Sequence, residues 1–197
     1  LIASQLQDLL WFIFHYLGLE PTGPSDVFNA TLTNMTVDML YSHDLIPQLC
    51  WIFIIFLIGK LWFKDTKVGL IGAALVVGHF VLDFFSGHPH HIFGVDTHKV
   101  GLGLYASNVF LAIAIEAVAT VAMLWYFFRE EAKKGIQRSS KNKNAIIGLF
   151  VFGIVFMLSI ATTSFRELLN IPEFDMGFNS NVPTLILTYL GIIFYLN

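Results

Sequence analysis

The sequence predicts an all-α fold, a polytopic transmembrane helix bundle of about five to six spans. Of the 197 residues, 56% are hydrophobic and only 13% are charged, and the mean hydropathy of +0.70 is well above that of a soluble domain. Four apolar segments reach or approach the length of about 20 residues that a helix needs to cross a bilayer. Aromatic side chains gather at the ends of these segments, where helices leave the membrane. The lipid bilayer is therefore the partner that the composition predicts.

The apolar segments differ in length. The four long ones cover residues 45–63, 68–85, 100–128 and 145–165. A run over 182–196 is slightly short for a span, and a run over 9–19 is shorter still. No initiator Met, charged leader region or cleavage site precedes the first run, so we expect it to be the end of a helix that begins upstream of Leu1.

Basic residues predict the orientation of the bundle. Only Lys99 and Arg166 fall on one side of the predicted spans, and nine Lys and Arg fall on the other: Lys60, Lys64, Lys67, Arg129, Lys133, Lys134, Arg138, Lys141 and Lys143. Because cytoplasmic connections carry the excess of Lys and Arg, the second side should be cytoplasmic, in a multi-pass protein of the cell membrane. The basic stretch 129–144 is then a cytoplasmic linker between a membrane domain over 1–128 and a two-helix membrane tail over 145–197.

Charge, cysteine content and motifs exclude several classes of protein. A net charge of −3 with 11 Lys and Arg provides no basic surface for a phosphate backbone, so no nucleic acid is expected as a partner. Cys50 is the single cysteine, so helix packing rather than an intrachain disulfide must hold the fold. The sequence contains no nucleophile elbow, Walker loop or kinase signature.

Two carboxyl groups lie inside predicted spans, where charged groups are rare and face a bundle interior or a wet cavity. They belong to Asp83 and Glu116. His79 precedes Asp83 by four residues, which places both side chains on one helix face about one turn apart. This spacing suits a shared metal ion and equally a structural His–Asp pair that bonds neighbouring helices. Glu116 is either a catalytic carboxylate or a neutral buried carboxyl bonded to a backbone or hydroxyl group.

Two further polar residues can reach the same depth. Asp8 opens the first apolar run, and His43 lies just before the next one. The helical rise of about 1.5 Å per residue places Asp8, His79 and Glu116 in the outer half of the membrane or near its midplane. A cavity that these residues line together with His43 and Asp83 is therefore geometrically possible. The structural alternative for Asp8 and His43 is a polar group at the start of a helix near the membrane surface.

An outer loop contains a second group of histidines, in His88-Pro-His-His91 followed by His98. Imidazole is the commonest neutral metal ligand, so this group is a candidate metal site. The loop also contains Gly and Pro, and a flexible surface cluster is the more common origin of such a sequence. We therefore expect these histidines at the surface and rank them below the intramembrane set.

Residues 6–128 resemble a family of uncharacterised polytopic membrane proteins related to the membrane-bound metal-dependent hydrolases. The order and spacing of four stretches carry the resemblance: Asp8 before Leu-Leu-Trp11, Tyr41-Ser-His-Asp-Leu45, Gly78-His-Phe-Val-Leu-Asp-Phe-Phe85, and Lys99-Val-Gly-Leu-Gly-Leu104 with Glu116 beyond it. The resemblance implies a site for a divalent metal ion such as Zn²⁺. Its ligands would be Asp8, His43, His79 and Asp83, and Glu116 would support it. The tail from Ala145 onward matches no family pattern.

Two positions depart from the family pattern. The pattern has Ser where this chain has Asp44, and it has His four residues after the helix Asp, where this chain has Gly87. His88, one residue later, is a shifted candidate ligand. A shifted ligand would alter the activity that the resemblance implies.

Two functions from different classes follow. In the first, the protein is a membrane-embedded hydrolase of lipid-like esters, in which a Zn²⁺-like ion lowers the pKa of a bound water and Glu116 accepts its proton. In the second, it is a non-catalytic subunit of a larger membrane complex, whose polar groups bond helices and whose 20 Phe pack on other membrane subunits. A haem between His43 and His79 is a further hypothesis, which an absorption spectrum tests. A di-iron desaturase needs more imidazoles than the seven present.

Overall fold

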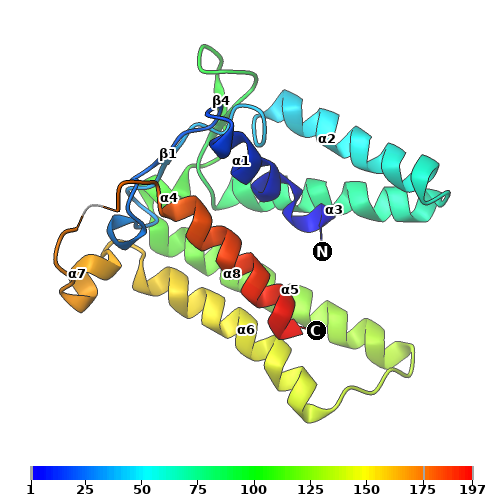
Figure 1. The fold of residues 1–197 in the computed structure, drawn as a ribbon. Coiled ribbons are helices and arrows are strands. Elements are labelled where there is room, and N and C mark those ends of the chain that lie inside the picture. The colour runs from blue at the N-terminus through cyan, green and yellow to red at the C-terminus, as the bar shows by residue number, and fades with distance from the viewer. Residues whose placement is uncertain (1, 175, 197) are drawn as a thin grey trace.

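The computed structural model describes residues 2–174 and 176–196, in which the regular secondary structure is helical apart from two short strand pairs and the rest is loops and turns (Figure 1). The helices are α1 (Leu6–Tyr16), α2 (Leu45–Leu57), α3 (Thr66–Phe85), α4 (Leu104–Ser107), α5 (Val109–Lys133), α6 (Ser140–Ser159), α7 (Phe165–Leu169) and α8 (Asn181–Leu196). A π-helical turn, η3 (Ile58–Trp62), extends α2, and two short 3₁₀ helices are η1 (Ala3–Gln5) and η2 (Val27–Asn29).

The strands are confined to the loops at one end of the helices. Strand β1 (Thr22–Gly23) pairs antiparallel with β2 (Thr36–Val37), and β3 (His90–His91) pairs antiparallel with β4 (Lys99–Val100). In the second pair His90 lies opposite Val100. These small pairs fold the connections at this end back over the helix ends.

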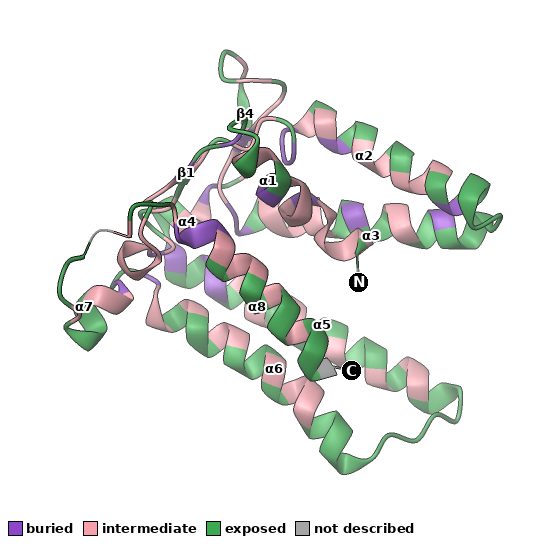
Figure 2. Cartoon of the chain, in the orientation of Figure 1, coloured by how far each residue is buried: buried purple, intermediate pink, exposed green. Residues whose placement is uncertain are grey.

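Four helices among the described residues are long and apolar enough to cross a membrane: Leu45–Trp62, Thr66–Phe85, Val109–Lys133 and Ser140–Ser159. A shorter apolar helix covers Asn181–Tyr195. Large apolar side chains are exposed along all of these helices, and few of their residues are buried (Figure 2). Helices that are apolar on their outer faces belong in lipid. The predicted all-α membrane bundle is therefore confirmed, with four long spans and one short apolar helix in the described residues.

The long helices form two groups that diverge from the end covered by loops (Figure 1). In one group α2 packs along α3, and α1 lies beside α3; in the other, α5 packs along α6. Trp11 and Phe12 of α1 pack on Val182 of α8, so the last helix joins the first. Val109 and Ile113 of α5 pack on Ala161. The core is thus concentrated near the loop-covered end, where the polar site lies.

Two glycines allow α2 and α3 to cross closely at the far end. A Cβ atom built on Gly59 would lie 2.2 Å from the Cα atom of Gly69. Small residues at such crossings let two helix backbones approach each other inside a membrane. Any larger side chain at Gly59 would push the two helices apart.

The third long helix begins later than predicted, at Val109 rather than at residue 100. Gly103 has a positive φ of 61° and Asn108 has a φ of −155°, so neither continues a helix. The Asn108 side chain accepts a hydrogen bond from the backbone N–H of Leu111 and caps α5. The preceding residues form β4 and α4 instead, and α4 carries Tyr105 into the site.

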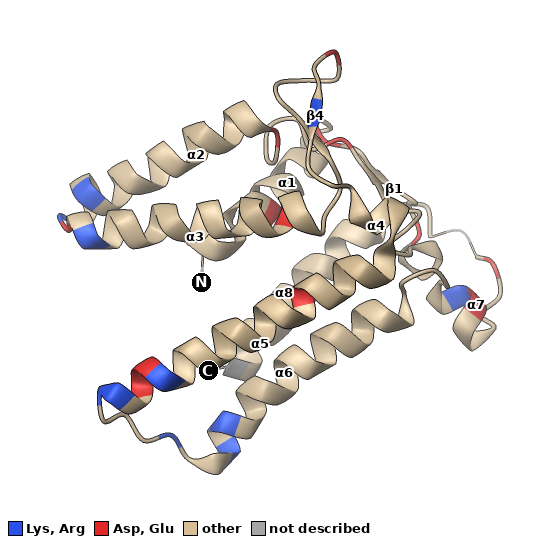
Figure 3. Cartoon of the chain, turned by 180° about the vertical axis from the view of Figure 1, so that it is seen from behind, with Lys and Arg blue, Asp and Glu red and all other residues tan. Residues whose placement is uncertain are grey.

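Basic residues lie mainly at one end of the long helices (Figure 3). The turns that join α2 to α3 and α5 to α6 are at this end, whereas β4 and α7, which carry Lys99 and Arg166, are at the opposite end. Helix α5 continues to Lys133 and α6 begins at Ser140, so the predicted linker is non-helical only over 134–139. That the basic end is cytoplasmic stays a prediction.

Candidate metal site

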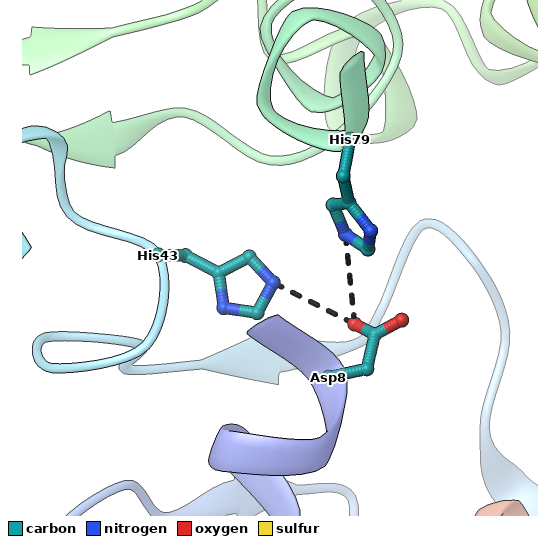
Figure 4. Close-up of side chains that lie close together, drawn as sticks. All are labelled: Asp8, His43 and His79. Carbon is teal, nitrogen blue, oxygen red and sulfur yellow. Dashed lines mark ion pairs between the residues drawn. The ribbon is translucent and has the colours of Figure 1, made fainter. Parts of the chain in front are cut away.

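Three of the predicted ligands meet at the loop-covered end of the bundle (Figure 4). Asp8 comes from α1, His79 from α3, and His43 from the segment just before α2. One ligand atom from each residue lies within 4.8 Å of the other two. Oδ1 of Asp8 is 3.6 Å from Nε2 of His43 and 3.8 Å from Nε2 of His79.

Asp83 adds a second carboxylate to the group. Its Oδ2 atom lies 3.3 Å from Nε2 of His79, one helical turn earlier, and 3.9 Å from Nε2 of His43. This oxygen is buried and has no hydrogen-bond partner among the described residues. A buried polar atom without a partner is costly, so a further group bound at this site would stabilise it.

The distances between these groups fit a bound cation better than direct hydrogen bonds. A charge-assisted hydrogen bond between nitrogen and a carboxylate oxygen measures about 2.7–2.9 Å, and all four nitrogen–oxygen separations here are longer, at 3.3–3.9 Å. Four ligands that bind an ion tetrahedrally at about 2.1 Å lie roughly 3.4 Å from one another. Two imidazoles and two carboxylates are also a donor set that Zn²⁺ and similar divalent ions accept. Among the described residues, Asp8, His43 and His79 form the group whose ligand atoms all lie within 4.8 Å of one another, so these three fit a divalent metal ion, and Asp83 lies beside both imidazoles at its edge.

Both imidazoles are held at the nitrogen that faces away from the carboxylates. Nδ1 of His79 lies 2.9 Å from the backbone carbonyl oxygen of Ser4. Because a carbonyl only accepts, Nδ1 carries a proton, and in the neutral ring it is Nε2 that presents a lone pair to the site. Nδ1 of His43 lies 2.7 Å from the hydroxyl oxygen of Ser42. Such contacts orient the ligand nitrogens of metal sites.

The tail contributes a residue that the sequence did not indicate. The hydroxyl of Tyr189, on α8, lies 2.6 Å from Oδ2 of Asp8 and 2.5 Å from Oε1 of Gln5. The two oxygens of Asp8 therefore have different neighbours: Oδ1 faces the imidazoles, and Oδ2 accepts a hydrogen bond from Tyr189. A tyrosine within an apolar run was the one sequence feature that could have indicated this contact, because a buried phenol usually has a hydrogen-bond partner.

The four candidate ligands Asp8, His43, His79 and Asp83 line one cavity of about 310 Å³. One part of its wall is polar and contains the candidate ligands together with His88, His90, Tyr105 and Glu116. Another part is apolar and is formed by Trp11, Leu32, Met35, Val37, Met39 and Leu82. A cavity of this kind can hold a molecule that carries a polar group on an apolar body.

Glu116 lies in the cavity wall and is paired with a hydroxyl group. The phenol of Tyr105 donates a hydrogen bond to Oε1 of Glu116. Burial and the neighbouring Glu116 carboxyl raise the pKa of Tyr105, so this phenol keeps its proton. The hydroxyl partner expected for a structural Glu116 is therefore present, and the carboxyl still lines the cavity that a catalytic Glu116 requires.

Of the loop histidines that we expected at the surface, His98 is exposed, but His88, His90 and His91 are not. The side chain of His90 is buried, and its ring stacks on that of His43 with 5.2 Å between ring centroids. Burial, and the nearby His43, lower the pKa of His90 to about 3. His91 is half-buried, with Nδ1 2.8 Å from the carbonyl oxygen of Thr97. The β3–β4 pair and its packing over the cavity hold these residues inside the fold.

His88, the shifted candidate ligand, lies in the cavity wall but outside the group of three converging ligands. Its ring packs edge-on against Tyr105, with 5.6 Å between centroids. Burial lowers the pKa of His88. A Cβ atom at Gly87 would lie 2.9 Å from the carbonyl oxygen of Asp83, so this backbone leaves no space for a histidine there.

Asp44, the other departure from the family pattern, serves the loop. Its two carboxylate oxygens accept hydrogen bonds of 2.8 Å from the backbone N–H groups of His91 and Gly94. These bonds fasten the β3–β4 connection over the start of α2. Asp44 therefore fixes the cavity wall and leaves the neighbouring His43 free to face Asp8.

Sequence reasoning also missed three buried polar residues around the site. Gln7 donates to Oε1 of Gln48 at 3.1 Å and to the carbonyl oxygen of Val76 at 2.9 Å, which joins α1, α2 and α3. Glu20 is fully buried, and burial raises its pKa against the opposing effect of hydrogen bonds from Ser42 and Tyr41. Glu20 follows an apolar run, where a glutamate is ordinarily a solvated membrane-surface residue.

No protein-family model, curated protein or solved structure matches the chain. The site itself combines one carboxylate and two imidazoles that could hold a metal ion, at the end of a bundle of membrane-length apolar helices.

Proposed function

We propose that the protein is a membrane-embedded, metal-dependent hydrolase of lipid-like esters, a relative of the membrane-bound metal-dependent hydrolases that residues 6–128 resemble. The observation that carries the proposal is the convergence of Asp8, His43 and His79, whose ligand atoms lie within 4.8 Å of one another. The unpartnered Oδ2 of Asp83 supports it, since this oxygen faces both imidazoles.

The four residues divide the work of such a site. His43 and His79 would hold the ion through Nε2, Asp8 through Oδ1 and Asp83 through Oδ2. When bound, a divalent ion supplies Lewis acidity, which polarises an ester and makes a water lose its proton near neutral pH. Glu116 would accept that proton from its place in the cavity wall, where the hydrogen bond from the Tyr105 hydroxyl holds its carboxyl.

The cavity favours a substrate with an apolar body. Its wall joins the carboxylate and imidazole groups to Trp11, Met35 and Leu82. A volume of about 310 Å³ holds a polar head and a few methylene groups rather than a whole lipid. The chains of a phosphate or acyl ester would then continue into the surrounding membrane.

Elemental analysis of protein purified without chelator tests the proposal. We expect about one divalent ion per chain in the wild type, loss of the ion in His79→Ala, and weaker binding in Asp83→Asn, which loses one charged ligand. The matched control is His98→Ala, because His98 is exposed and lies outside the cavity. Hydrolysis of a phospholipid in mixed micelles should follow the metal content.

A metal-free wild type would contradict the hydrolase and favour the alternative, a non-catalytic subunit of a larger membrane complex. In that case His79→Ala should lower the thermal midpoint, because the His79–Asp83 pair of α3 would then serve only to bond this helix to its neighbours. The absorption spectrum of the same samples tests for haem between His43 and His79.

A further inference from the structure

Glu20 occupies an unusual position for a carboxyl group. It follows α1, is 0% exposed, and has no positively charged neighbour among the partners that bond it. Its Oε1 atom accepts from the backbone N–H groups of Tyr41 at 2.6 Å and Ser42 at 2.9 Å. Its Oε2 atom accepts from the Ser42 hydroxyl at 2.7 Å. A buried carboxylate with three donors is held in one orientation.

The Ser42 hydroxyl links this carboxylate to the candidate metal site. A hydroxyl has one proton to donate, and Ser42 donates it to Glu20. The same oxygen lies 2.7 Å from Nδ1 of His43, so in this second contact it must accept. Nδ1 of His43 therefore carries the ring proton, and Nε2 is left with a lone pair that points toward Asp8 and Asp83.

We infer that Glu20 is a positioning residue that fixes, through Ser42, which nitrogen of His43 carries the proton and so prepares Nε2 to bind a metal ion. This inference rests on the proposed function for its purpose, but the protonated nitrogen of His43 can be measured without any metal. His79 needs no such linked hydrogen bonds, because its Nδ1 lies against the carbonyl oxygen of Ser4, which can only accept.

Glu20→Gln should keep the hydrogen bonds from residue 20 through Ser42 to His43 but reverse their donors and acceptors. The two backbone N–H groups at Tyr41 and Ser42 require an acceptor, so the amide oxygen of Gln must take the place of Oε1. The amide nitrogen then replaces Oε2 and donates to the Ser42 hydroxyl. Ser42 has to donate in turn to Nδ1 of His43, and the ring proton moves to Nε2, which loses its lone pair.

The experiment uses full-length, metal-free protein labelled with ¹⁵N-histidine, and long-range ¹H–¹⁵N spectra that distinguish the two neutral tautomers. We expect the His43 signals of the wild type to show a proton on Nδ1, and those of Glu20→Gln a proton on Nε2. His43→Ala assigns the signals. The matched control is Glu173→Gln, because Glu173 is exposed and lies outside the cavity; it should leave the spectrum unchanged.

Titration with Co²⁺, read by its visible absorption, supplies the second measurement. Glu20→Gln should bind Co²⁺ about 10–100-fold more weakly than the wild type, the effect typical of losing a group that orients a metal ligand. If Glu20→Gln does not fold, Ser42→Ala tests the same link, because it removes the acceptor of Nδ1 and should weaken Co²⁺ binding.

The outcomes separate the inference from the proposed function. A wild type with the ring proton on Nε2, or a Glu20→Gln protein with the wild-type tautomer and Co²⁺ affinity, would overturn the role of Glu20. A wild type with the proton on Nδ1 that binds no Co²⁺ would support the role of Glu20 and overturn the hydrolase instead.

Discussion

The hydroxyl of Tyr189, on the last helix, lies 2.6 Å from Oδ2 of Asp8, on the first. This contact joins residues 181 positions apart in the chain and leaves only Oδ1 of Asp8 to face His43 and His79. The tail is therefore part of the candidate site rather than an appendage to it.

Tyr189→Phe removes this hydrogen bond and keeps the aromatic packing on Phe12. We expect Co²⁺ affinity to fall by about tenfold, because Asp8 loses the group that orients it, and stability to fall by about 1 kcal/mol, as for other hydrogen bonds between membrane helices. Co²⁺ titration and thermal unfolding in detergent measure both effects. Tyr195→Phe on the same helix is the control, and equal effects of the two variants would contradict the role of Tyr189.

The parts of the site that sequence predicted are those fixed by local geometry. His79 and Asp83 share a helix face because four residues make about one helical turn, and their side chains do approach to 3.3 Å. The helical rise placed Asp8 and His79 in the same half of the membrane or near its midplane, and His43 was expected to reach them from the membrane surface. Their convergence depended on how α1 packs against α3, which periodicity does not specify.

The contributions that sequence could not supply depend on packing between distant segments. Tyr189 reaches Asp8 only because Val182 of α8 packs on Trp11 and Phe12. Glu20 is buried where the connection between α1 and α2 folds back, so that Ser42 bonds its carboxylate. His90 was expected at the surface, and its burial requires the β3–β4 pair, whose two-residue strands have no recognisable alternation of polar and apolar residues.

Glu116→Gln should separate catalysis from metal binding. The amide can still accept the Tyr105 hydroxyl bond but cannot accept a proton, so we expect the ion to be retained and kcat for ester hydrolysis to fall by about 100-fold or more. Elemental analysis and a hydrolysis assay measure the two quantities. Glu130→Gln is the control because Glu130 lies on the same helix and pairs with Lys133 at the surface. Loss of the ion from Glu116→Gln would instead make Glu116 a ligand.

His90 should make the metal-free fold sensitive to acid. Its pKa is about 3 in the folded protein, because it is buried beside His43, and about 6.5 when unfolded. The folded state therefore binds fewer protons than the unfolded state. The contribution of His90 to the free energy of unfolding is fully present above pH 6.5 and is lost as the pH falls toward 3. Between pH 7 and pH 5 the loss from this one group is about 2 kcal/mol.

Thermal unfolding at pH 7 and pH 5, in chelated protein, measures this effect. On acidification, the thermal midpoint of His90→Gln should fall less than that of the wild type, because Gln does not titrate. His98→Gln, at an exposed histidine, should keep the wild-type response. Equal responses of His90→Gln and the wild type would show that His90 does not limit stability in acid.

The orientation of the bundle decides which compartment a substrate enters from. Nine of the eleven Lys and Arg lie on one predicted side of the spans, so the α5–α6 turn should be cytoplasmic, and the loop-covered end with the cavity should face outward. In a Cys50→Ser background, we expect Gln137→Cys to react with a membrane-impermeant maleimide only after cells are permeabilised. Glu173→Cys, at an exposed position in the connection before α8, should react in intact cells. The reverse pattern would place the cavity on the cytoplasmic side, and labelling of both positions from one side would contradict the bundle itself.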